Sequence, residues 1–171
     1  MTTVHIDDLS ARLQQHHAAL GDGRDCRSDT EKAHWFAATT TCQRVISGLR
    51  NAPNDLARVQ AKLHDVDTQR AAVRAKEAEL VQVIADAPDP STCADARERD
   101  REYDRQAHLR RQLEHLHAGT LRCAPDACYV QLEEVERRIA ELTDRRDRAQ
   151  LQLDALVQQA TALLGAVAVT T

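Results

Sequence analysis

Two histidines and two cysteines near residue 120 are of the side-chain types that bind zinc: His115, His117, Cys123 and Cys128. Their spacing argues against a shared ion. Residues two positions apart on a helix point to different sides, so both histidines could bind one ion only if the helix ends before Gly119. Four residues also separate the cysteines, where a zinc knuckle usually has two. We therefore expect surface histidines beside loop thiols, with no metal and no cofactor.

A second pattern, Glu-x-x-His, occurs at Glu31–His34 and at Glu114–His117. In di-iron helical bundles two such pairs meet at one site. Here one pair begins the second predicted helix and the other ends the fourth. In an up-and-down bundle these ends lie about 30 Å or more apart. The sequence also contains no nucleophile elbow, phosphate-binding glycine loop or His-Glu-x-x-His motif. We predict that the chain is not an enzyme.

Helix-breaking residues divide the chain into segments. Gly21 and Gly23, Pro53, Pro88 with Pro90, and Gly119 with Pro125 mark the breaks. Strand-like runs with period two do not occur. The sequence predicts an all-α fold without a sheet, made of an elongated antiparallel helical bundle or coiled coil. Two shorter helices, about 5–20 and 29–51, precede three long ones, about 54–86, 91–118 and 126–165.

Two of the long segments carry apolar residues at alternating three- and four-residue spacing. The positions are Leu56, Val59, Leu63, Val66, Arg70, Val73, Glu77, Leu80 and Ile84, then Leu132, Val135, Ile139, Leu142, Arg146, Ala149, Leu153, Leu156, Ala160 and Leu163. Sixteen of these 19 positions are apolar, about twice the number expected from a 42% hydrophobic composition. This spacing is typical of a left-handed coiled-coil seam.

Three seam positions are polar: Arg70, Glu77 and Arg146. If one antiparallel helix separates the helices that begin at residues 54 and 126, those two helices are parallel. Arg146 and Glu77 then lie at similar heights, about 4.5 Å apart along the axis. We expect these two residues to pair, and Arg70 to reach acidic residues on the helix 91–118. Their expected role is to set register and partner choice.

The segment 94–105 is almost wholly charged, with opposite charges three residues apart at Glu98–Arg101 and Glu102–Arg105. Each such pair adds a few tenths of a kcal/mol to a solvated helix. We expect this half of the helix to face water rather than a partner.

Candidate interaction residues lie near both ends of the chain. Trp35 and Phe36 are the only Trp and Phe, and on a helix their side chains diverge by about 100°. One of them can enter the local core while the other faces a partner. The last 17 residues, from Ala155, carry no charged side chain. We expect this end, with Leu156, Leu163 and Leu164, to form a docking or oligomer surface, or else a terminal turn that folds back on the bundle.

Composition and charge exclude several classes of protein. A net charge of −4 and a pI near 6.0 argue against nucleic-acid binding. No apolar run reaches the roughly 18 residues of a membrane span, and the acidic N-terminus is unlike a signal peptide. Five irregularly spaced cysteines favour free thiols over a secreted disulfide framework. We expect a cytoplasmic, reducing environment, with no membrane and no nucleic-acid partner.

Only about a fifth of the residues are Leu, Ile, Val or Phe, which is low for a thick globular core. We divide the chain into an N-terminal helical pair, 1–52, and antiparallel coiled-coil helices, 53–171. The favoured function is a structural or adaptor subunit of a larger protein assembly, cytoskeletal, axonemal or viral in type, within a hetero-complex or homo-oligomer. A small helical regulatory binder or inhibitor is the first alternative. A metal-binding protein that uses the His/Cys cluster is the second.

Overall fold

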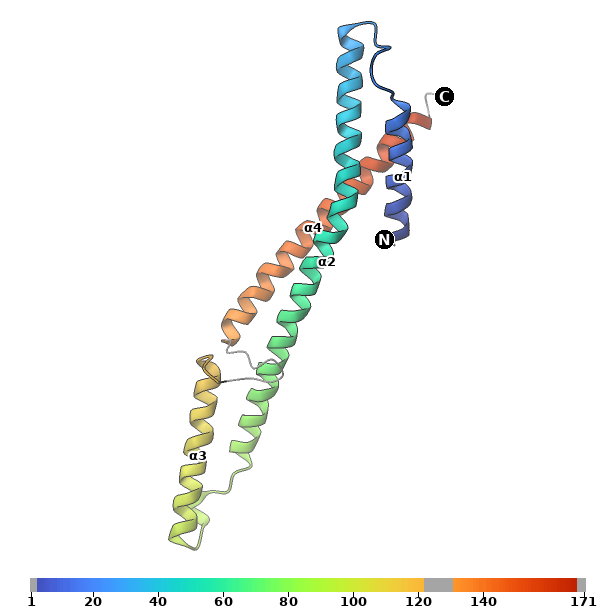
Figure 1. Ribbon diagram of the computed structural model, residues 1–171. Helices are drawn as coiled ribbons and strands as arrows, with labels where there is room; N and C mark the ends of the chain where they lie inside the picture. Colours follow the sequence, from blue (N-terminus) through green and yellow to red (C-terminus); the bar gives the residue numbers. More distant parts are fainter. Residues whose placement is uncertain (1–2, 122–130, 169–171) are drawn as a thin grey trace. The chain divides into compact units, whose positions relative to one another are not determined.

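The computed structural model describes residues 3–121 and 131–168, and every regular element in these ranges is helical (Figure 1). The helices are α1 (Thr3–Ala19), α2 (Asp29–Ala85), α3 (Ala96–His117) and α4 (Leu132–Ala168), with a short 3-10 helix η1 (Pro90–Thr92) before α3. The all-helical prediction is confirmed for this part of the chain. Four α-helices are found where five were expected.

The difference lies at Pro53, where a helix break was predicted and is wrong: α2 continues through the proline for 57 residues. Proline removes one backbone N–H and normally kinks or ends a helix. Here Leu49 and Ala52, before the proline, and Leu56, after it, form one row of apolar side chains on α2. All three are buried in the same core cluster. Ending the helix at Pro53 would take half of this row out of the core, and burial outweighs the lost hydrogen bond.

The other predicted breaks agree with local capping contacts. Ser28 and Glu31 form a capping box at the start of α2, in which Glu31 N–H donates to Ser28 Oγ (3.1 Å) and Ser28 N–H donates to Glu31 Oε2 (3.2 Å). Asp95 caps α3 by accepting from Arg97 N–H at 3.3 Å. Gly119, with φ of +68°, follows the end of α3 in the left-handed conformation that favours glycine. The proline at 125 lies outside the described residues.

The contacts divide the chain into two compact units. Unit 1 comprises Met1–Gln60 and Asp144–Thr171, and unit 2 comprises Ala61–Thr143. Both α2 and α4 contribute residues to each unit. The expected division between residues 52 and 53 stays a prediction; α2 is continuous there, and α4 supplies residues to the core around α1.

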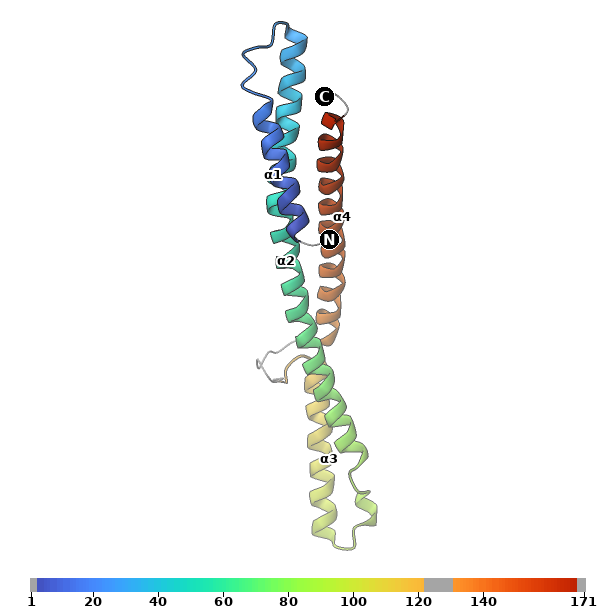
Figure 2. The same ribbon diagram turned by 90° about the vertical axis from the view of Figure 1, so that its right-hand side faces the viewer.

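Unit 1 is a three-helix arrangement of α1, the first part of α2 and the last part of α4 (Figure 2). Its core is a single cluster of apolar side chains: Ile6, Leu9 and Leu13 from α1, Val45, Leu49, Ala52 and Leu56 from α2, and Leu153, Val157 and Ala160 from α4. All of these residues are at least nine-tenths buried. The cluster shows that α1 completes a core that α2 and α4 begin.

In the described part of unit 2, Val66 of α2 and Val135 of α4 are buried, together with one cluster of apolar side chains. Val73 and Leu80 of α2 and Leu116 of α3 form this buried cluster. The partly buried residues that pack against this cluster are Leu109, Leu113, Leu121 and Leu132. Helix α3 is antiparallel to α2, since His117 contacts Glu77 whereas Gln106, eleven residues earlier, donates to the Pro88 carbonyl at 2.8 Å.

The three–four spacing agrees with burial in both α2 and α4. All 19 seam positions, from Leu56 to Ile84 and from Leu132 to Leu163, are buried or half-buried. The periodicity therefore identified the inward faces of both helices.

The predicted parallel course of α2 and α4 is wrong, because α4 is antiparallel to α2. In unit 1, Gly48 of α2 lies against Leu156 of α4, and Ala52 of α2 lines a depression together with Ala149 of α4. Residue numbers therefore rise along α2 in the direction in which they fall along α4. The reason lies in unit 2. There the end of α3 contacts α2 at Glu77 and the start of α4 contacts α2 one turn earlier, at Arg74, so α3 and α4 lie one after the other along α2.

Candidate interaction surfaces

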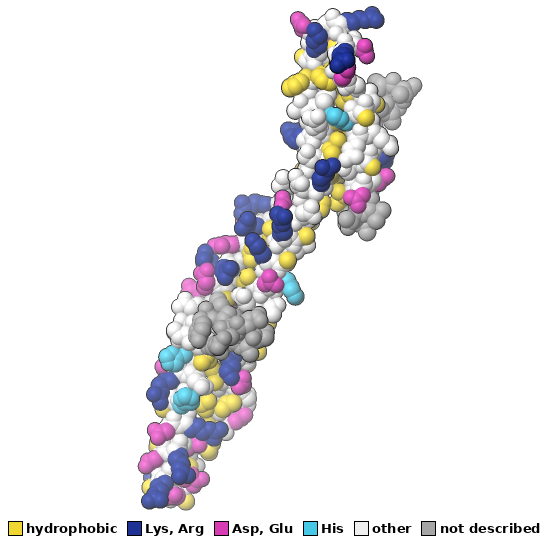
Figure 3. Space-filling model, in the orientation of Figure 1, with side chains coloured by type: hydrophobic (Ala, Val, Ile, Leu, Met, Phe, Trp, Pro, Cys, Tyr) yellow, Lys and Arg dark blue, Asp and Glu magenta, His cyan; other side chains and the backbone are white. Residues whose placement is uncertain are grey.

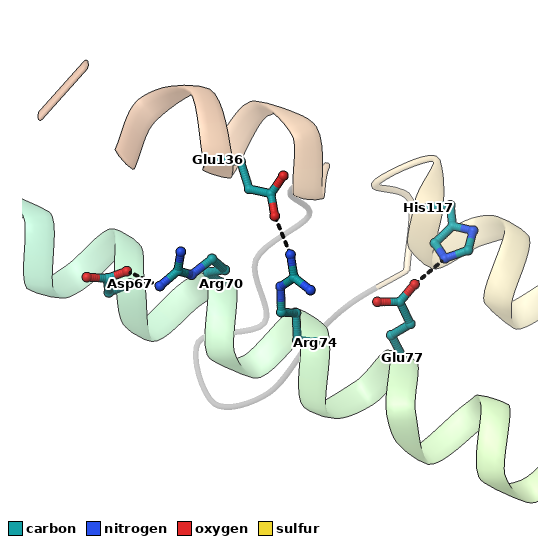
Figure 4. Close-up of polar contacts among 6 residues, drawn as sticks. All are labelled: Asp67, Arg70, Arg74, Glu77, His117 and Glu136. Atoms are coloured by element: carbon teal, nitrogen blue, oxygen red, sulfur yellow. Dashed lines mark hydrogen bonds and ion pairs between the residues drawn. The ribbon is translucent and has the colours of Figure 1, made fainter. Parts of the chain in front are cut away.

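A row of polar side chains follows α2 through unit 2 (Figure 4). Arg70 pairs with Asp67 in its own helix at 2.8 Å, Arg74 pairs with Glu136 of α4, and Glu77 contacts His117 of α3. Figure 4 shows the last two contacts bridging from α2 to two different helices. These charged side chains therefore link α2 to both α3 and α4.

The partners of the polar seam residues differ from those expected. Glu77 contacts His117 Nε2 at 2.7 Å, and Arg146 pairs with its neighbour Asp147 at 2.7 Å, so the predicted Glu77–Arg146 pair is not formed. Arg70 pairs within α2 and not with α3. The physical reason is the direction of α4, which removes the register on which the expected pair depended.

The His/Cys cluster is only partly described. His115 Nδ1 lies 2.9 Å from Thr120 Oγ1, within the turn that ends α3, whereas His117 contacts Glu77. The two histidines therefore have different partners. Cys123 and Cys128 lie outside the described residues. Within residues 3–121 and 131–168, no three His, Cys, Asp or Glu side chains are grouped as a metal site would require.

Trp35 and Phe36 have different environments, as their divergence on the helix predicts. The indole Nε1 of Trp35 donates to the Leu20 carbonyl at 3.0 Å, and its ring lies against Gly23 in the loop before α2. Phe36 is 66% exposed. Trp35 thus fastens the loop between α1 and α2, while Phe36 faces solvent and remains a candidate contact residue.

The leucines expected at a docking surface are partly buried in unit 1. Leu156, Leu163 and Leu164 all pack against its core cluster. Leu156 lies over Gly48, and a Cβ added at that glycine would come within 2.6 Å of Leu156 Cδ2. Of the two expectations for this end of the chain, the side-chain packing of residues 156–164 favours the one that folds back on the bundle.

Sequence reasoning did not single out three exposed apolar residues: Val81 (49% exposed), Tyr103 (55%) and Leu151 (69%). Each lies outside the three–four rows of its helix. An apolar residue at a position between seam residues is the signal that could have identified Val81 and Leu151. Tyr103 lies within the charged segment 94–105, and eleven of its twelve residues are exposed, in agreement with the expected solvated face.

The surface carries mixed charge. In the view of Figure 3, basic and acidic side chains are both spread over the visible face. On α4, Arg137 contacts both Glu134 (2.7 Å) and Glu141. The hydrogen bond from Arg137 lowers the pKa of Glu134, and the same contact raises the pKa of the guanidinium. Cys42 of α2 is fully buried, and this burial raises the pKa of its thiol and favours the neutral form.

None of the described helices is both long enough and apolar enough to span a bilayer. Comparisons with models of protein families, with curated proteins and with solved structures found no match to this chain.

Proposed function

We propose that the chain is a non-enzymatic structural or adaptor subunit of a larger protein assembly, of cytoskeletal, axonemal or viral type, and that it acts through helix–helix contacts. The observation that carries this proposal is the small number of buried apolar side chains among the described residues of unit 2. Val73, Leu80 and Leu116 form its buried cluster, and Val66 and Val135 are the other described valines or leucines of the unit that are buried. Helix segments that bury so few apolar side chains gain little free energy from packing, and contacts with a partner would add to it.

A second observation supports the proposal. Large apolar side chains remain exposed on three helices although both seams face inward: Phe36 and Val81 on α2, Tyr103 on α3 and Leu151 on α4. Single exposed apolar residues are common on soluble proteins. Here there are four such residues, and the other exposed positions described on these helices are polar or small. The four residues offer partner helices several apolar contacts.

The test is the native mass of the chain in its own cells. A tagged chain is expected to migrate in native extracts at several times its own 19.1 kDa, with defined partners found by mass spectrometry. Val81→Asp should shift it toward the monomer. Gln82→Asp, the matched control at the neighbouring exposed position, should not. A chain that migrates only as a monomer would contradict the proposal, and a complex with one small target would favour the regulatory binder.

A further inference from the structure

The way α1 is held in unit 1 separates it from the other helices. Among the described residues no hydrogen bond or ion pair joins α1 to α2 or α4, and its one ion pair, Arg12–Asp8, is internal. Within the core it is held by three apolar side chains, Ile6, Leu9 and Leu13, at spacings of three and four residues, and just beyond its end the Leu20 carbonyl accepts a hydrogen bond from Trp35 Nε1 of α2. Apolar contacts without polar partners impose little directional constraint, so any helix with the same row fits the same groove.

The groove under α1 does not depend on α1 for its shape. It is formed by Val45, Leu49, Ala52 and Leu56 of α2 together with Leu153, Val157 and Ala160 of α4. Helices α2 and α4 also contact each other directly, where Leu156 lies over Gly48. Removing α1 would therefore leave an apolar groove between two helices that still hold one another.

Two further features favour release of α1. His17, in the last turn of α1, buries its Nε2 atom without a hydrogen-bond partner, and release of α1 would let water reach this atom. The nine residues 20–28 that connect α1 to α2 include Gly21 and Gly23, both at positive φ. A connector of this length spans up to about 30 Å when extended.

We propose that α1 is an exchangeable helix, and that the groove between α2 and α4 binds the α1 of a second copy of the chain. A second copy is the occupant because its α1 carries the same row of Ile6, Leu9 and Leu13 that fills the groove within one chain. Intramolecular docking is favoured at low concentration, since the tethered helix has an effective concentration in the millimolar range. Exchange rises with protein concentration. This inference does not depend on the function proposed above.

The experiment uses the full chain in equal mixtures of natural and ¹⁵N-labelled copies. A photo-crosslinking amino acid replaces Ser10, which lines a depression with Leu49 and Pro53. Crosslinks from α1 to α2 that join a labelled to an unlabelled peptide are expected to increase several-fold between micromolar and millimolar protein, toward half of the total. If α1 crosslinks stay unmixed at every concentration, the proposal is wrong.

Two controls make the result specific to α1. The same amino acid in place of Gln152, which lines the α2–α4 depression with Asn51, should give only unmixed crosslinks. Equal mixing at both sites would mean association without helix exchange and would overturn the proposal. Leu9→Asp should abolish the mixed α1 crosslinks and leave the Gln152 crosslinks intact, whereas Gln14→Asp on the exposed side of α1 should change neither. Mixed α1 crosslinks that persist in Leu9→Asp would also contradict it.

Discussion

The Nε2 atom of His117, in the last turn of α3, lies 2.7 Å from Oε1 of Glu77 in α2. The histidine side chain is 55% exposed and the glutamate 31% exposed. The contact joins two helices of unit 2 beside the buried residues Leu116 and Leu80. The Glu77 carboxylate therefore contacts His117 and not Arg146, which was the partner predicted from the sequence.

A double-mutant cycle on Glu77→Ala and His117→Ala should give a coupling free energy of about 0.5 kcal/mol in urea unfolding. The value is modest because the pair is partly exposed and solvent screens it. The control cycle replaces His117→Ala by His115→Ala, because His115 contacts Thr120 and not Glu77. Coupling of equal size in both cycles would show that the Glu77–His117 contact is not specific.

The loop before α2 should tolerate alanine at Gly21 better than at Gly23. Both glycines have positive φ, so alanine strains the backbone by about 1 kcal/mol at either position. Only at Gly23 would the new Cβ also meet the Trp35 ring, at 2.8 Å. Gly23→Ala should therefore lower the free energy of unfolding further and shift the fluorescence of the only Trp. An identical Trp35 spectrum in both variants would contradict this packing.

Alanine should stabilise the chain at only one of the two helical glycines of unit 1. Gly165→Ala adds a Cβ with no heavy atom within 4 Å, so the gain in helix propensity, up to about 1 kcal/mol, should stabilise the chain. Gly48→Ala brings a Cβ to 2.6 Å from Leu156 Cδ2, and the forced shift of that leucine should cancel the gain. Thermal unfolding of both variants is the measurement. Leu156→Ala should restore the benefit at Gly48, and a stabilised Gly48→Ala single variant would refute the contact.

The turn before α3 should weaken in acid. The Ser91 backbone N–H donates to Asp89 Oδ1 at 2.9 Å, and this bond, with a further one from the Ser91 side chain, lowers the pKa of the Asp89 carboxyl. Because the folded pKa is lowered, the cap stabilises η1 above the ordinary pKa of an aspartate and loses this effect as pH falls through the lowered value. The protection factor of the Ser91 amide, which is its exchange rate compared with the intrinsic rate at the same pH, should fall over that range.

The matched variant for the acid effect is Asp89→Asn, which keeps a capping oxygen but has no carboxyl group to protonate. In this variant the protection factor of the Ser91 amide should not fall with pH over that range. An unchanged fall in Asp89→Asn would assign the effect to another carboxylate. NMR titration of Asp89 in the unaltered chain should give a pKa below the usual aspartate value.

The sequence by itself determined which faces of α2 and α4 turn inward and that α2 begins near residue 29, whereas α3 begins at Ala96 and not near residue 91. The three–four spacing from Leu56 and from Leu132 marks positions that are all buried or half-buried. The Ser28–Glu31 capping box and the Asp95 cap lie within one turn of the residues that they satisfy. Such signals are local, so the residue order alone is enough to show them.

Only the tertiary structure decided which helices meet and in which direction. Pro53 is a local break signal, yet α2 continues because the buried row on both of its sides belongs to one core. The partner of Glu77 is His117 because α4 follows α3 along α2 without turning back. These outcomes depend on apolar side chains that segments far apart in the sequence bury together. The free energy of this burial exceeds the local conformational preference of any single residue.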